Sequence, residues 1–271
     1  MSATIADYRS HRELLSNLTL RELRSKYKRS ALGWGWSLVN PVVYLVVYTV
    51  VFKYFMHVKI LKAEPSGLNV YALFLLCAML PFSYFQSSVM GSIGSLTGNA
   101  NLIKKTYFPR ELLPASVVMG NLVSHAIEMS LLIVALLAFG DWRAIPYLPV
   151  TIFLILVVAV FALGLGLALS ALNVYFRDIE HFMGILFLVW FFMTPIVYSF
   201  ATLGSSAKTW VIDLLKLNPM TDAALSFRAT LYQGTYPGPF ELLYFVAFAV
   251  GTFLIGRWVF NRLEGGLAEE L

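Results

Sequence analysis

Three polar side chains interrupt an apolar stretch of the chain at a spacing that places them on one face of a helix. They are Asn121, His125 and Glu128, separated by four and three residues. A carboxylate beside an imidazole could act as an acid–base pair, and an intramembrane carboxylate is by default a candidate functional group. The two groups could equally bond each other, or a neighbouring helix, and only fix packing. A proton relay would need further ionisable groups, and Glu128 is the only acidic residue deep in any of the apolar stretches.

A second candidate is a row of aromatic residues. Tyr44, Tyr48, Phe52 and Phe55 follow at spacings of four, four and three, which predicts a ridge along one helix face. Contact with lipid does not require such a ridge, because Leu and Val would serve. The row is therefore typical of a surface that stacks on flat groups, or of packing between helices and an interfacial aromatic belt.

Motifs for an enzymatic or nucleotide-driven site are absent from the sequence. It contains no G-x-x-x-x-G-K-[ST] phosphate loop, no H-x-x-x-H metal pair and no G-x-S-x-G nucleophile elbow. The single cysteine, Cys77, rules out a disulfide framework within the chain. We therefore expect no catalytic residue, bound cofactor or metal in this chain.

The polar residues and the aromatic row must be positioned by membrane helices. The chain is 59% hydrophobic and 13% charged, whereas soluble domains carry about 25% charged residues. The composition predicts an all-α protein that crosses the membrane several times. We assign 1–37 to a cytoplasmic N-terminal segment and 38–271 to a transmembrane domain. The apolar runs predict six spans, at about 38–56, 70–96, 112–139, 146–172, 182–200 and 240–260.

Small and basic residues predict how these spans are arranged. Gly164 and Gly166 favour a tight contact between helices. Lys and Arg gather beside the spans on the side of the N-terminus, which predicts a multi-pass protein of the cytoplasmic (inner) membrane with both termini cytoplasmic. The net charge of +5 is explained by anionic lipid at that surface, so we expect no nucleic-acid partner.

Three segments outside the spans have amphipathic patterns. Residues 8–29 predict a basic helix that lies along the membrane surface or packs its apolar face on a partner. Residues 99–111 mix apolar and basic side chains, which suits a short helix in the groove of a soluble partner or a basic membrane anchor. Residues 201–239 contain two stretches, broken at Asn218-Pro219, that we interpret as short helices re-entering or capping the outer mouth between the fifth and sixth spans.

Four sequence blocks follow one another along the chain. They are Tyr27-x-x-Ser30-x-Leu32-Gly33-x-x-Trp36-x-x-x-x-Pro41; Leu102-Ile103-Lys104 through Phe108-Pro109 to Leu113-Pro114; Asn173-x-x-x-Arg177-Asp178 to Trp190 and Thr194-Pro195-Ile196-x-Tyr198; and Asn218-Pro219 with Arg228 after it. Together they resemble one family, the membrane subunits of ABC-2 type polysaccharide exporters, which move O-antigen, teichoic acid, capsule or galactan polymers. The resemblance covers nearly the whole chain.

The resemblance implies a homodimer of six-helix subunits above two copies of a separate ATPase that binds ATP and Mg. The cargo would be an undecaprenyl- or other polyprenyl-linked polysaccharide, and 8–29 would be the interface helix. The aromatics that would line the channel are Tyr44, Tyr48, Phe52, Phe55, Trp190, Phe191 and Tyr198. The loop that couples to the ATPase would contain Leu102, Lys104, Lys105, Tyr107, Phe108 and Arg110. The lipid pyrophosphate would be attracted by Lys26, Lys28 and Arg29.

Two other functions stay open from the residues. An ABC-2 exporter of small amphiphiles or drugs would share the same architecture. A membrane-embedded enzyme acting on a polyprenyl substrate would use Glu128 and His125 as acid and base. No second carboxylate or metal set accompanies that pair in the sequence.

Overall fold

The computed structural model describes residues 5–27, 35–55, 57, 63–106, 108–200 and 209–271, and within these ranges the regular elements are all helical. The main helices are α1 (Ile5–Tyr27), α2 (Trp36–Tyr48) with the π-helical turn η2 (Thr49–Phe55), α3 (Tyr71–Ile93), α4 (Ala100–Lys105), α5 (Leu112–Ala138), α6 (Leu148–Tyr175), α7 (Ile179–Met193), α9 (Thr209–Lys216), α10 (Pro219–Arg228) and α11 (Pro239–Leu263). Shorter turns are η3 (Thr97–Asn99), η4 (Trp142–Tyr147), η6 (Ala229–Gln233), η7 (Glu264–Gly266) and α12 (Leu267–Glu270).

The predicted all-helical membrane class is confirmed. Among the described residues, 4 helices are long and apolar enough to cross a membrane, and they match the second, third, fourth and sixth predicted spans. The first and fifth predicted spans correspond to shorter apolar helices, Leu45–Phe55 and Ile179–Met193. The continuous helix at the fifth predicted span is shorter than the predicted range of about 182–200, which contains Pro195. Helix α7 ends at Met193 because Pro195 disfavours helical geometry at Thr194, which is extended.

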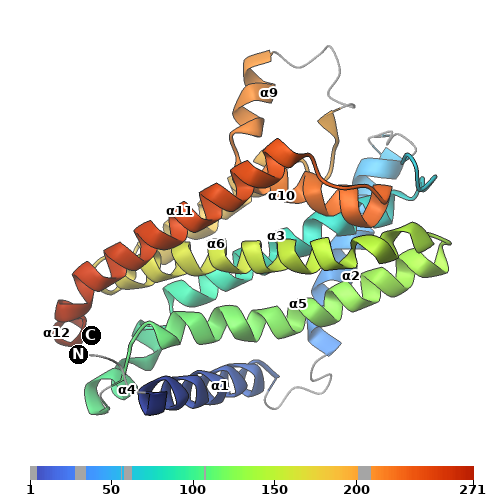
Figure 1. Cartoon of the computed structure of the whole chain (residues 1–271). Helices are drawn as coiled ribbons and strands as arrows, with labels where there is room; N and C mark the ends of the chain where they lie inside the picture. Colours follow the sequence, from blue (N-terminus) through green and yellow to red (C-terminus); the bar gives the residue numbers. More distant parts are fainter. Residues whose placement is uncertain (1–4, 28–34, 56, 58–62, 107, 201–208) are drawn as a thin grey trace.

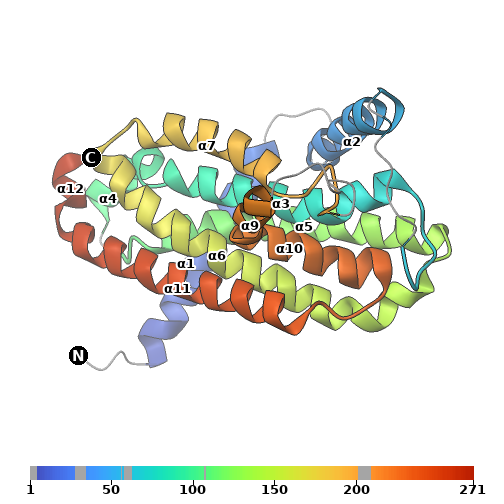
Figure 2. The ribbon, with the colours of Figure 1, turned by 90° about the horizontal axis from the view of Figure 1, so that it is seen from above.

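The long helices run alongside one another, and α3 lies at the centre of the bundle (Figures 1 and 2). Helix α6 packs against α11 on one side and α3 on the other, and α5 packs against α3. Helix α1 lies along α5 with Leu18 and Leu23 buried. The predicted N-terminal helix therefore exists, and part of its apolar face, around Leu18 and Leu23, packs on α5 of the same chain.

Glycines set the closest helix contacts, as the sequence predicted for Gly164 and Gly166. Gly164 lies against the backbone of Phe253 in α11, and a Cβ on Gly164 would be 2.6 Å from the Cα of that residue. Gly166 faces Ser92 of α3 in the same way. Helix α6 can approach both neighbours so closely only because these two positions carry no side chain.

The buried side chains form two clusters. The larger one is built mainly on α3, α5, α6 and α10, and α7 and α11 contribute to it. A second cluster joins α1, α4, α5, α6 and the C-terminal residues; its members include Leu18, Ile103, Leu113 and Leu267. It lies at the end of the bundle where α4 and α12 meet (Figure 1). The short segment 99–111 is thus anchored on the C-terminal residues and on α1.

Asp141 follows α5 in a connection between spans, and its side chain is buried. Burial raises the pKa of this carboxyl, and the backbone N–H and charge of Arg143 oppose that effect without cancelling it. The folded protein therefore holds the proton more tightly than the unfolded chain does. The resulting destabilisation is absent below the ordinary pKa of an aspartate and grows as the pH rises toward the raised value.

We therefore expect Asp141→Asn to raise the melting temperature at neutral pH, with little difference at pH 4. The measurement is thermal unfolding of both purified proteins between pH 4 and 8. Parallel pH dependence of the two proteins would show that Asp141 does not change its proton affinity on folding.

Candidate functional site

A cleft of about 270 Å³ opens between α2, α3 and α7. Four aromatic rings and two polar side chains contribute to its walls: Tyr48, Phe82, Phe187, Phe191, Ser83 and Gln86. The residues come from three helices that are far apart in the sequence. The cleft combines flat apolar surfaces with groups that can form hydrogen bonds, which suits a ligand that is polar at its edges and apolar on its faces.

Two of the aromatic residues predicted from the first and fifth spans, Tyr48 and Phe191, meet in this cleft. The rings of Tyr48 and Phe191 stack, with centroids 5.4 Å apart and an interplanar angle of 22°. Phe82 meets Phe191 edge-on at 5.5 Å, and Phe52 is 6.0 Å from Tyr48. Sequence reasoning missed Phe82, because nothing in the sequence shows which face of α3 turns toward α2 and α7.

The described side chains of Phe55, Trp190 and Tyr198 are not among the residues that line this cleft. Phe55 is 74% exposed, and the Tyr198 hydroxyl donates to the carbonyl of Phe192. Trp190 packs on Phe85 and Phe187 in the core, on a different side of α7 from Phe191. The side chain of Tyr44 lies outside the described residues. A channel-lining role stays a prediction for all seven aromatics.

The end of α7 is held by Asn218, the residue that begins the fourth sequence block. The Asn218 side chain caps α10 by accepting from the Met220 N–H. It also accepts a hydrogen bond from the Trp190 indole at 2.8 Å and donates to the Thr194 hydroxyl at 2.9 Å. One amide thereby fixes both the start of α10 and the last turn of α7.

Arg228 completes this α7–α10 junction from the other end of α10. Its side chain is buried, and the guanidinium lies 3.6 Å from the ring centre of Phe74. It donates to the carbonyls of Phe74, Pro195, Ile196 and Tyr198. A basic residue in an otherwise weakly charged helix was the signal for this contact, but the sequence did not show that backbone carbonyls would be the partners.

The predicted coupling loop forms the short helix α4 and the turn after it. Leu102 and Phe108 pack on the second cluster, while Lys104 and Lys105 are exposed. Arg110 donates to the carbonyl of Glu264 at 2.6 Å. Tyr107 lies outside the described residues, and so do Lys28, Arg29 and the side chain of Lys26. A role in coupling or in lipid binding stays a prediction.

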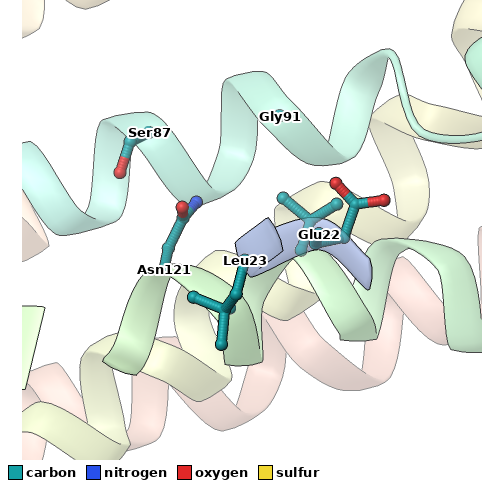
Figure 3. Close-up of a pocket in the computed structure, with 7 residues that line it drawn as sticks. Glu22, Leu23, Ser87, Gly91 and Asn121 are labelled. Carbon is teal, nitrogen blue, oxygen red and sulfur yellow. The ribbon is translucent and has the colours of Figure 1, made fainter. Parts of the chain in front are cut away.

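The three polar residues of α5 are buried or nearly so. His125 Nδ1 lies 3.8 Å from Glu128 Oε2, beyond hydrogen-bonding distance, and its ring stacks on Tyr84 with centroids 4.8 Å apart. Asn121 lines a separate pocket of about 170 Å³ between α1, α3 and α5, where it points toward α3 near Ser87 (Figure 3). Within the described residues, no metal-binding group of three His, Cys, Asp or Glu side chains occurs.

Comparison with known proteins identifies relatives along most of the chain. The model of the ABC-2 type transporter family matches residues 13–232. An O-antigen export system permease protein of Myxococcus xanthus is 30% identical over 100% of both chains. A Klebsiella pneumoniae protein of the same name is 30% identical over 96% of this chain and 95% of its own. The polysialic acid transport protein of Escherichia coli is 25% identical over 91% and 92%.

Proposed function

Because this chain belongs to the ABC-2 type transporter membrane family, we propose that it forms the membrane channel of an ATP-driven exporter of lipid-linked polysaccharide. The observation that carries this proposal is the cleft where Tyr48 and Phe191 stack. Sugar rings present flat C–H faces that pack on aromatic rings, so such a wall can hold varied sugars without binding them tightly. The names of the relatives, O-antigen and polysialic acid export proteins, support the same class of cargo.

The proposed assembly contains two copies of this chain, each with six spans. Helix α2 with η2, and helix α7, supply the two spans beyond the four long helices. Their outer faces expose apolar side chains next to the cleft, among them Val46 and Ile185, which a second copy could cover. Helices α9 and α10 would cap the outer mouth, and both termini would be cytoplasmic.

A separate ATPase would supply the energy, since the sequence has no phosphate loop. Two copies of it, each binding ATP and Mg, would dock beside α4, where Lys104 and Lys105 are exposed. The polyprenyl pyrophosphate of the cargo would be attracted to the basic surface around Lys26, Lys28 and Arg29. The cargo would then cross the cytoplasmic membrane along the aromatic cleft.

We expect the double substitution Tyr48→Ala and Phe191→Ala to lower polysaccharide export about tenfold. Each aromatic contact contributes roughly 0.5–1.5 kcal/mol, and about 1.4 kcal/mol corresponds to a tenfold change. Surface polysaccharide is measured against the amount of this chain in the membrane, together with its copurification with the ATPase. Phe240→Ala is the control, because Phe240 is 83% exposed on α11. Normal export by the double variant would contradict the proposed path.

The enzyme alternative receives no added support from the geometry. His125 and Glu128 are close, but the cleft lined by Tyr48 and Phe191 contains neither of them. Within the described residues, His125 makes no side-chain hydrogen bond that would orient it as a base. The pair is better explained as a packing contact between α5 and Tyr84 of α3.

A further inference from the structure

The cleft has a polar wall that the aromatic residues do not explain. Ser83 and Gln86 are three residues apart on α3, so both project from one face of that helix into the cleft. Both side chains are half-buried. Within the described part of the chain, neither makes a hydrogen bond to another residue. Half-buried polar side chains that have no protein partner are available to bond a ligand or water in the cleft.

A glycine on α7 leaves further space in the cleft. Gly184 of α7 lines the cleft, and a Cβ at this position would meet nothing within 4 Å. The stacked rings of Tyr48 and Phe191 form the adjoining apolar surface. A ligand in the cleft would therefore meet both flat ring surfaces and an amide with a hydroxyl.

This combination favours a sugar over other ligands of a membrane channel. A sugar ring carries hydroxyls at its edge, which can bond the Gln86 amide and the Ser83 hydroxyl, both of which donate and accept. Its C–H face can pack on the aromatic rings. A hydrocarbon chain would leave Ser83 and Gln86 unpaired. The volume of about 270 Å³ lies just below the range of roughly 300–1,000 Å³ for small-molecule sites, so it suits one ring better than an extended oligosaccharide.

We propose that Ser83 and Gln86 form a hydroxyl-binding subsite that contacts one sugar ring of the polymer at a time and contributes to the choice of cargo. This inference rests on the proposed function, because it assumes that the polymer passes the cleft. In this proposal the aromatic rings hold the polymer, and Ser83 and Gln86 form hydrogen bonds that depend on the positions of its hydroxyls.

The test compares Gln86→Leu, which keeps the side-chain volume but removes the amide, with Gln86→Asn, which retains an amide. Export is measured as surface polysaccharide per amount of this chain in the membrane. Binding is measured on purified chain in lipid nanodiscs, with oligosaccharide released from the surface polysaccharide of the source strain. We expect Gln86→Leu to weaken binding and lower export about fivefold to tenfold, as loss of one hydrogen bond predicts, and Gln86→Asn to recover part of both.

Ser83→Ala should lower both quantities about twofold to threefold. Ser87→Ala is its matched control, because Ser87 lies on the same helix but lines the other pocket and bonds the carbonyl of Tyr84. Wild-type binding and export by both Gln86→Leu and Ser83→Ala would overturn the subsite.

Gly184→Phe distinguishes an error in the proposed subsite from an error in the proposed path of the polymer. The added ring fills the cleft, and we expect it to block export while the chain remains in the membrane at its normal level. Blocked export by Gly184→Phe, with wild-type binding and export by both Gln86→Leu and Ser83→Ala, would leave the path in place and refute the subsite. Normal export by Gly184→Phe would refute both, because the polymer would then cross elsewhere.

Discussion

Replacing Gly256 with alanine should separate α11 from α6 and lower the stability of the protein by about 3 kcal/mol, at the upper end of typical overpacking costs. A Cβ at Gly256 would overlap the carbonyl oxygen of Gly164 and lie 3.1 Å from the Gly164 Cα. These are backbone atoms, so no side-chain rotation can relieve the overlap. The helices must move apart along the most extensive helix contact in the fold.

The measurement is thermal unfolding of the purified chain in detergent, where about 3 kcal/mol corresponds to a decrease of roughly 10 °C in melting temperature. Gly251→Ala is a matched control on the same helix, since a Cβ there would meet nothing within 4 Å. Alanine has the higher helix propensity, so the control should be neutral or slightly stabilising. Equal effects of the two substitutions would show that α6 and α11 are not held at this distance.

Replacing Arg228 with methionine should destabilise the α7–α10 junction by about 3 kcal/mol and reduce export. The substitution keeps much of the side-chain volume but removes the donors to the carbonyls of Phe74, Pro195 and Ile196. Buried carbonyls left without a donor cost about 1–3 kcal/mol each, and relaxation of the loop recovers part of that cost. Export should fall because the end of α7, next to Phe191, loses its support.

Arg228→Lys distinguishes the shape of the side chain from its charge. An ammonium keeps the charge, but it lacks the planar fork that reaches several carbonyls at once, so we expect little recovery. Melting temperature and export are measured for both variants. Arg257→Met is the control, because Arg257 is exposed on α11. Full stability of Arg228→Lys would show that the positive charge, and not the set of hydrogen bonds, holds the junction.

The helical membrane class and the long spans follow from the sequence alone, because a run of apolar residues long enough to cross the bilayer has no other stable state there. Local rules also predicted the break at Asn218-Pro219 and the small-residue contact of Gly164. Each of these signals is carried by residues close together in the chain, so no knowledge of the fold was needed. The four sequence blocks, in turn, indicated the family that the comparisons establish.

The partners of each helix face were decided by tertiary structure. Periodicity placed Tyr48 on an aromatic ridge, but only packing brought it onto Phe191 and turned Trp190 toward Asn218. For the same reason, the sequence did not show that Ser83 and Gln86 line this cleft. Almost every residue of a membrane helix is apolar, so the sequence contrast between a lipid-facing side and a cleft-facing side is weak. The choice between them depends on how the helices fit together, which is a property of the whole chain.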